Sequence, residues 1–200
     1  IGLDTGLGKT FVQLEWARLI ANHTLIIAPL SVARQTVREA LKINISVKYV
    51  RSQDEVEGDG IYITNYEMAE HFDETCFDAV VLDESSILKA IAGKYRQMLT
   101  KKFKNTKYRL CCTATPAPND HAEIGMHSEF LGILQHNEML ANFFINANKV
   151  KEIIVTRSNG NKAKIREKQA GKKGQEWRLR NYAKGEFYQW MASWAIMMSK

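Results

Sequence analysis

The sequence has little cysteine and no long apolar run. Three cysteines in 200 residues, with no CxxC pair, are too few for a disulfide framework. The histidines at 121, 127 and 136 lack the i, i+4 spacing of a helical metal site. No run approaches the ~20 apolar residues of a membrane helix, and no secretory signal is present. We therefore expect a cytoplasmic domain without membrane contact, whose cysteines are buried and reduced.

The positive charge is concentrated late in the chain. Residues 149–184 contain 12 Lys or Arg against 3 Glu, whereas the remainder contains 16 basic and 19 acidic residues. Residues 159–174 have almost no apolar side chains, so we expect 149–176 to be a flexible, basic surface insertion. Such a segment either contacts a polyanion or is a solvated loop, and composition leaves both open.

Short apolar runs alternate with amphipathic stretches, the pattern of a parallel sheet flanked by helices. The expected strands span 24–28, 47–50, 61–64, 79–82 and 109–113. The expected helices span 9–21, 32–41, 95–101 and 121–134. Ser31 is expected to cap the second helix. With 45% hydrophobic residues, 200 residues suffice for one α/β domain with a sizeable core.

The segment LDTGLGKT, residues 3–10, precedes the first helix and has the composition of a phosphate-binding loop. Gly6 and Gly8 let backbone N–H groups curl around phosphate oxygens, Lys9 meets the phosphate charge, and the Thr10 hydroxyl can bind Mg²⁺. Leu3 stands where the strict pattern has glycine, and the strand that should lead into the loop is missing from the sequence. The plain alternative is a turn before a helix.

The segment VVLDESS, residues 80–86, is an apolar strand that ends on the adjacent carboxylates of Asp83 and Glu84. This arrangement matches a Walker B site, where the Asp orders Mg²⁺ through water and the Glu polarises the attacking water. Such a pair is common at strand ends. Its position 74 residues after Lys9, with two or three strand–helix units between, is what the fold requires.

The segment CTATP, residues 112–116, follows the next expected strand. The small hydroxyl side chains of Thr113 and Thr115, around Ala114, can hydrogen-bond the acidic pair and sense the γ-phosphate. This segment alone indicates little about function. Its third place in the ordered series gives it much more weight.

Together these segments resemble the first lobe of superfamily 2, DEAD/DEAH-box helicases, and most closely the Swi/Snf-type branch. The resemblance rests on LDTGLGKT, IIAPLSV (26–32), TNYEM (64–68), VVLDESSILK (80–89) and CTATPAPND (112–120). The DESS variant, FLGIL at 130–134 and the tail near Trp190 are similar to phage and prophage helicases. The insertion matches no segment of the family.

The resemblance implies a P-loop NTPase fold over residues 1–148, a RecA-like three-layer sandwich with a mainly parallel central sheet. An aromatic helical extension, 177–200, would follow the insertion and lead into a second lobe of the same parent chain. In this extension one helical face is expected to be core; it comprises Phe187, Trp190, Met191 and Trp194.

On the matching positions, the resemblance implies an ATP- and Mg²⁺-dependent DNA helicase or translocase. Glu84 would be the catalytic base, with Asp83 and Lys9 as further catalytic residues, and Thr10 and Asp83 would hold Mg²⁺. Nucleotide phosphates would bind to Thr5, Gly6, Leu7, Gly8, Lys9 and Thr10. Thr113, Ala114 and Thr115 would be the coupling residues.

The resemblance also implies contacts to the backbone of double-stranded DNA without sequence preference, in the cytoplasm of a bacterial or phage-infected cell. These contacts would come from Pro29, Leu30, Ser31, Thr64, Asn65 and Tyr66. The second lobe of the family supplies an arginine finger, worth about 10³–10⁵ in phosphoryl-transfer rate. We therefore expect the isolated chain to be nearly inactive.

Two other functions stay open. A non-catalytic remnant could bind DNA through the basic segment, but it would have no chemical need for Lys9, Asp83 and Glu84 together. A P-loop ATPase of another class, such as a nucleotide kinase, would need a substrate-phosphate pocket and lid arginines where this chain has TATP and TNYEM.

Overall fold

A five-stranded parallel sheet forms the centre of the molecule, in the order β3-β4-β2-β5-β6. The computed structural model describes residues 1–90, 93–117, 121–146, 150–156, 162–168 and 177–200. The central strands are β2 (His23–Ala28), β3 (Val47–Tyr49), β4 (Gly60–Asn65), β5 (Ala79–Asp83) and β6 (Tyr108–Cys112). Each lies within two residues of its predicted bounds.

Successive side chains of the central strands enter two separate apolar clusters. On β2, Leu25 and Ile27 pack into one cluster, and Ile26 and Ala28 into the other. Because neighbouring side chains on a strand point to opposite faces, a strand covered on both faces must be apolar throughout. This is why the sequence predicted the central strands well.

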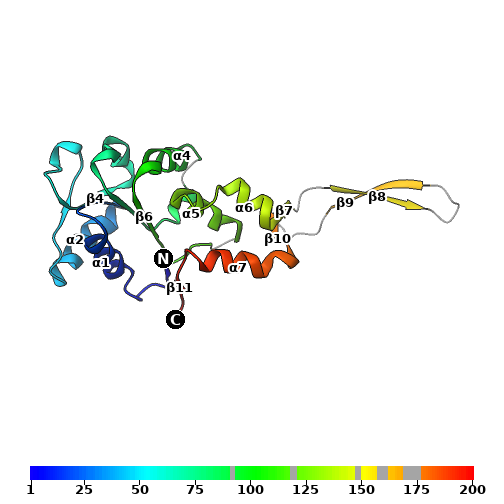
Figure 1. The fold of residues 1–200 in the computed structure, drawn as a ribbon, viewed down its shortest axis with the longest axis horizontal. Helices are drawn as coiled ribbons and strands as arrows, with labels where there is room; N and C mark the ends of the chain where they lie inside the picture. Colours follow the sequence, from blue (N-terminus) through cyan, green and yellow to red (C-terminus); the bar gives the residue numbers. More distant parts are fainter. Residues whose placement is uncertain (91–92, 118–120, 147–149, 157–161, 169–176) are drawn as a thin grey trace.

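Helices cover both faces of the sheet (Figure 1). The cluster on one face contains residues of α1 (Lys9–Ile20) and α2 (Leu30–Lys42). The cluster on the other face contains residues of α3 (Ile87–Ala90), α4 (Gly93–Lys102) and α5 (Ile124–Leu131). The predicted three-layer α/β sandwich is therefore confirmed. None of the helices in the described part of the chain has the length and apolar character that crossing a membrane requires.

Short 3₁₀ turns connect these elements. They are η1 (Gln53–Glu55), η2 (Tyr66–His71), η3 (Glu74–Cys76), η4 (Phe103–Asn105), η5 (His121–Glu123) and η6 (Asn181–Ala183). The predicted helix over 121–134 is shorter than expected, because Gly132 adopts a left-handed conformation (φ 73°) that ends α5 after Leu131.

The start of α2 differs from the prediction. Pro29, not Ser31, precedes the first helical residue, and its carbonyl accepts hydrogen bonds of 2.9 Å from the N–H groups of Val32 and Ala33. The proline ring fixes φ near the value needed at a helix start, here −57°. Ser31 therefore lies inside the first turn, where its side chain is exposed.

The sheet continues past β6 at the edge where the chain termini meet. The two-residue strand β1 (Gly2–Leu3) forms a parallel bridge from Gly2 to Thr113, and the Leu3 N–H donates to the Thr113 carbonyl at 3.0 Å. On its other side β1 pairs in parallel with β11 (Met197–Met198), so the two termini lie close together (Figure 1). A two-residue strand therefore lies directly before the loop of residues 4–8.

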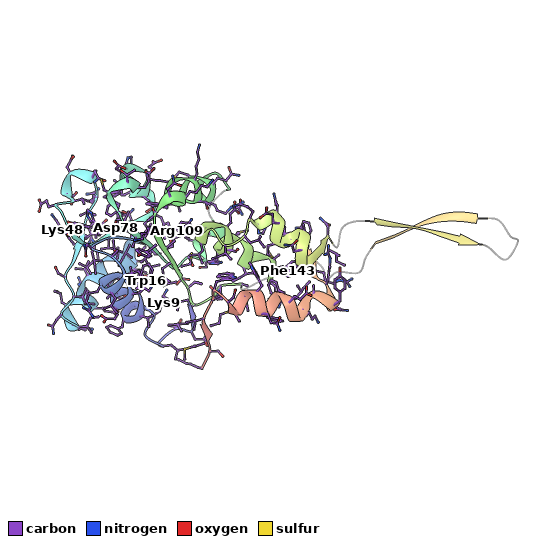
Figure 2. The ribbon with its side chains drawn as sticks, in the orientation of Figure 1. Lys9, Trp16, Lys48, Asp78, Arg109 and Phe143 are labelled. Atoms are coloured by element: carbon purple, nitrogen blue, oxygen red, sulfur yellow. The ribbon has the colours of Figure 1, made fainter. Side chains whose placement is uncertain are left out.

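A second body packs beside the sandwich. It contains α6 (His136–Phe143), β7 (Phe144–Asn146), β10 (Trp177–Leu179), which pairs with β7, and α7 (Lys184–Ala192). Figure 2 labels Phe143, whose ring lies 5.5 Å from that of Phe187 on α7. Phe187 is 1% exposed, and Trp190, Met191 and Trp194 pack against the same cluster. The predicted aromatic core face is confirmed, but β10 and β11 show that the extension is not helical throughout.

The basic insertion contains a hairpin. Strands β8 (Val150–Thr156) and β9 (Lys162–Lys168) pair antiparallel, and in Figure 1 the hairpin extends away from the rest of the molecule. The sequence analysis expected a flexible insertion here and did not predict the two strands; the β-branched residues of VKEIIVT favour a strand despite the nearby charge. The rest of the predicted insertion (149, 157–161 and 169–176) lies outside the described residues.

Candidate active site

A loop of residues 4–8 connects β1 to α1 and has the geometry of an anion site. Gly6 and Gly8 adopt φ values of 88° and 80°. In this backbone region a residue with a Cβ atom would be strained. No side chain caps α1, so its first N–H groups and the positive end of its dipole face the loop opening. Thr5 and Gly6 are exposed, and Leu7 and Thr10 are partly buried. These residues together can surround an anionic group.

Lys9 connects this loop to the acidic pair. Its Nζ lies 2.9 Å from Asp83 Oδ1 and 2.9 Å from Glu84 Oε2. Figure 2 places Lys9 at the start of α1, with Trp16 further along the same helix. The Asp83 side chain is 1% exposed and that of Glu84 is 35% exposed. The fold thus brings the first and second predicted motifs into one ion-pair cluster at the carboxyl edge of the sheet.

The contacts in this cluster favour the ionised forms of Lys9 and Glu84. Burial by itself would lower the pKa of Lys9, but the charges of Asp83 and Glu84 and the hydrogen bonds to them outweigh burial and raise it. Burial by itself would raise the pKa of Glu84, but the hydrogen bond and charge of Lys9 outweigh burial and lower it. The site therefore keeps a cation between two carboxylates.

Glu84 has an unusual backbone conformation, and its side chain contacts the third motif. Its φ is 55°, in the left-handed region that a non-glycine residue rarely adopts. Its Oε1 accepts hydrogen bonds of 2.9 Å from the hydroxyls of Ser86 and Thr113. The Thr115 N–H donates to Thr113 Oγ1 at 3.1 Å, and Ala114 lies between them, partly buried. The predicted coupling segment therefore contacts the acidic pair directly.

Two further residues hold Asp83, and neither was predicted from the sequence to do so. The Gln13 side-chain amide donates to Asp83 Oδ2 at 3.1 Å. The Tyr66 hydroxyl donates to the Asp83 main-chain carbonyl at 2.9 Å. Gln13 lies one helical turn after Lys9, so the i, i+4 relationship was a signal that could have indicated a shared face. Burial raises the pKa of Tyr66 well above its ordinary range, so Tyr66 remains a neutral donor.

The residues predicted to face nucleic acid fall into two groups. Pro29 is partly buried, while Leu30 and Ser31 are exposed at the start of α2. Thr64, Asn65 and Tyr66 are only 0%, 6% and 2% exposed. These side chains are buried because β4 lies inside the sheet and Tyr66 is turned to Asp83. Their contact with a nucleic-acid backbone stays a prediction.

The donor set fits a magnesium ion bound together with nucleotide. Magnesium is commonly held by one or two carboxylates, with phosphate oxygens and water completing the coordination. Asp83, Glu84 and the Thr10 hydroxyl at the start of α1 supply such oxygens. Within the described ranges, no three or more His, Cys, Asp or Glu side chains converge on a site for any other metal. Burial raises the pKa of Cys111 and Cys112 to about 12, so both are thiols.

Comparisons with known proteins agree with this geometry. Residues 3–153 match the family model described as the SNF2-related domain. A comparison with curated proteins finds no match.

Three solved structures have similar folds. The UvsW helicase from bacteriophage T4 has 15% identity and a TM-score of 0.52, covering 65% of this chain and 51% of that chain. The Hef helicase domain from Pyrococcus furiosus has 18% identity and a TM-score of 0.51, covering 66% and 32%. A hypothetical ATP-dependent RNA helicase from Sulfolobus tokodaii has 16% identity and a TM-score of 0.50, covering 70% and 50%.

This chain spans about half or less of the length of these three structures. At such identities the likeness shows the fold, which is the RecA-like sandwich of helicase domains. The family match covers well over half of the chain and includes all three chemical motifs. The chain therefore belongs to the SNF2-related domain family, the Swi/Snf-type branch of superfamily 2 helicases, and is a helicase-type ATPase lobe.

Proposed function

We propose that this chain binds ATP with Mg²⁺ and acts as the first lobe of a DNA-dependent ATPase of the helicase or translocase type. The observation that carries the proposal is the position of Lys9 Nζ, 2.9 Å from both Asp83 and Glu84, directly beside the phosphate-type loop. A cation, two carboxylates and the N–H groups of a helix start in one cluster are the parts that phosphoryl transfer requires.

The contacts divide the roles between these residues. Lys9 and the loop N–H groups would bind phosphate, and Thr10 and Asp83 would hold Mg²⁺, which neutralises phosphate charge when bound. Glu84 Oε1 is engaged by Ser86 and Thr113. Once Lys9 bonds to phosphate, Glu84 Oε2 is the oxygen left to accept a proton from water. Glu84 is therefore proposed as the general base, oriented by Thr113.

The start of α2 is the proposed contact to the DNA backbone. Leu30 and Ser31 are exposed there, and Arg34, Arg38 and Lys42 follow at four-residue spacing along one exposed face. Cations at this spacing can neutralise phosphates without reading sequence. The basic insertion is a second proposed contact. The duplex form of the DNA and the kinship with phage proteins stay predictions.

Substitutions in the full-length protein test the proposal. Lys9→Ala should weaken ATP binding, because the phosphate loses its cation. Glu84→Gln should keep ATP binding and lose turnover by about 10²–10⁴-fold, the usual size of a general-base contribution. Glu74→Gln is the matched control, because Glu74 pairs with Lys102 and not with a residue of the candidate site. Turnover by Glu84→Gln at the parental rate would remove Glu84 from the base role.

DNA dependence separates this function from the two alternatives. A translocase should hydrolyse ATP faster when duplex DNA is added, and the acceptor of the phosphoryl group should be water. A nucleotide kinase would instead transfer the group to a second nucleotide. A non-catalytic remnant would bind DNA without turnover. The chain alone, without the arginine finger of a second lobe, should bind nucleotide but hydrolyse it slowly.

A further inference from the structure

Gln13 is a buried polar side chain inside the apolar layer between α1 and the sheet. It is 0% exposed, as are its buried neighbours on α1, Leu14 and Ala17. Its amide nitrogen donates to Asp83 Oδ2 at 3.1 Å. Its amide oxygen meets no hydrogen-bond donor in the described part of the chain.

This one-sided bonding indicates which end of the amide matters. A buried acceptor without a partner is unfavourable, and an apolar residue would avoid it. Turning the amide over would set its oxygen against a carboxylate oxygen, and both atoms are acceptors. We therefore infer that the amide N–H group is the part of Gln13 that matters, and its partner is the carboxylate of Asp83.

Gln13 and Lys9 contact different oxygens of the Asp83 carboxylate. The partly exposed Lys9 contacts Oδ1, and the buried Gln13 donates to Oδ2. Tyr66 bonds only the main-chain carbonyl of Asp83 and cannot set the rotation of the side chain. When Lys9 bonds to phosphate, Gln13 remains as the donor that keeps Oδ2 turned inward.

We propose that Gln13 is a positioning residue for Asp83: it holds Oδ2 inside the protein and so presents Oδ1 to the cation that accompanies the nucleotide. This proposal rests on the proposed nucleotide-binding function. Groups that orient a metal ligand typically change metal affinity by about 10–100-fold. The effect of Gln13 should therefore appear in the part of nucleotide binding that depends on Mg²⁺.

The test measures the Kd of a fluorescent ADP analogue for this chain, once with Mg²⁺ and once with EDTA. The ratio of the two Kd values measures how much Mg²⁺ strengthens nucleotide binding, which we call the Mg²⁺ gain. The Kd measured with EDTA reports the binding that Lys9 and the loop provide without Mg²⁺. Gln13→Met has nearly the same shape without the N–H group, and Gln13→Glu replaces the donor by an acceptor that repels Asp83. Thr36→Val is the control, a buried polar-to-apolar change on α2 where the hydroxyl bonds its own helix.

We expect Gln13→Met to reduce the Mg²⁺ gain about tenfold and Gln13→Glu to reduce it further, with EDTA Kd values within about twofold of the parent. Thr36→Val should leave the gain unchanged. A full Mg²⁺ gain in Gln13→Met would overturn the proposal. Equal losses with and without Mg²⁺, together with a lower Tm, would show a packing role instead. If the unsubstituted chain binds ADP with no Mg²⁺ gain, the proposed function itself fails.

Discussion

Thr113 Oγ1 donates a hydrogen bond to Glu84 Oε1 across 2.9 Å, although the residues are 29 positions apart and follow the ends of two neighbouring strands. The register of the sheet explains the contact. Asp83 on β5 pairs with Cys112 on β6, so the residues that follow the two strands, Glu84 and Thr113, leave the sheet side by side. The third motif thus contacts the second at the first position beyond the strands.

Removing this hydrogen bond should slow hydrolysis without weakening nucleotide binding. Thr113→Val keeps the shape and removes the hydroxyl, which leaves Ser86 as the remaining hydroxyl donor to Glu84 Oε1. A hydrogen bond to a charged group contributes about 1.5–3 kcal/mol, so kcat in the full-length protein should fall roughly ten- to hundredfold. Thr113→Ser keeps the donor and serves as the control. An unchanged kcat in the valine variant would contradict the proposed orientation of Glu84.

The lowered pKa of Glu84 predicts a pH-dependent contribution to stability. Burial opposes ionisation, but Lys9, Ser86 and Thr113 outweigh it, so the folded pKa lies below the ordinary value of 4.5. This contribution to the free energy of unfolding is present above the ordinary pKa and is lost as pH falls through the folded pKa. Urea unfolding of the parent and Glu84→Gln between about pH 3 and 7 should show a difference that shrinks at low pH. A difference independent of pH would contradict the ion pair.

The aromatic cluster around α7 should contribute strongly to folding. Phe187 is 1% exposed and lies 5.5 Å, ring centre to ring centre, from both Phe143 and Phe144. Phe187→Ala should lower the free energy of unfolding by about 3–5 kcal/mol, as large-to-small changes in cores do. Tyr182→Ala, on a side chain that is 80% exposed, should change it by less than about 0.5 kcal/mol. Similar losses in both variants would show that the cluster is not a core.

The basic face of α2 should contribute to the salt dependence of DNA binding. Replacing Arg34, Arg38 and Lys42 by Gln removes three exposed charges beside the proposed backbone contact. The slope of log affinity against log salt on duplex DNA should then fall by about 0.9 for each phosphate that is no longer neutralised. Replacing Lys101, Lys104 and Lys107 removes the same charge from another part of the surface and should leave the slope unchanged. If both triple variants lowered the slope of log affinity against log salt by the same amount, the loss would come from net charge alone and not from the face of α2.

The basic insertion makes a parallel prediction. Lys162, Lys164, Arg166 and Lys168 occupy alternate positions of β9, and Lys172 and Lys173 follow outside the described residues. If the insertion binds DNA, replacing these six residues by Ser or Gln should lower the salt slope by about 0.9 for each phosphate that they neutralise. An unchanged slope would mean that the insertion is a solvated segment without a role in DNA binding.

The sequence by itself determined the sandwich and the three motifs. Strands buried on both faces are apolar runs, and the carboxyl ends of parallel strands meet at one edge, so Lys9, Asp83 and Glu84 could be predicted to converge. Their roles as phosphate, magnesium and base residues stay predictions that the substitutions above test.

Only the tertiary structure decided the contacts that depend on how helices rotate against the sheet. The packing of α1 against the sheet turns Gln13 toward Asp83, and Tyr66 reaches Asp83 from η2. Thr64 and Asn65, for which the family resemblance implies contacts to DNA, are buried because β4 lies inside the sheet. The pairing of β1 with β11 likewise left no pattern in the sequence. Backbone hydrogen bonds between chain ends are made by groups that every residue shares, so composition and periodicity carry no signal for them.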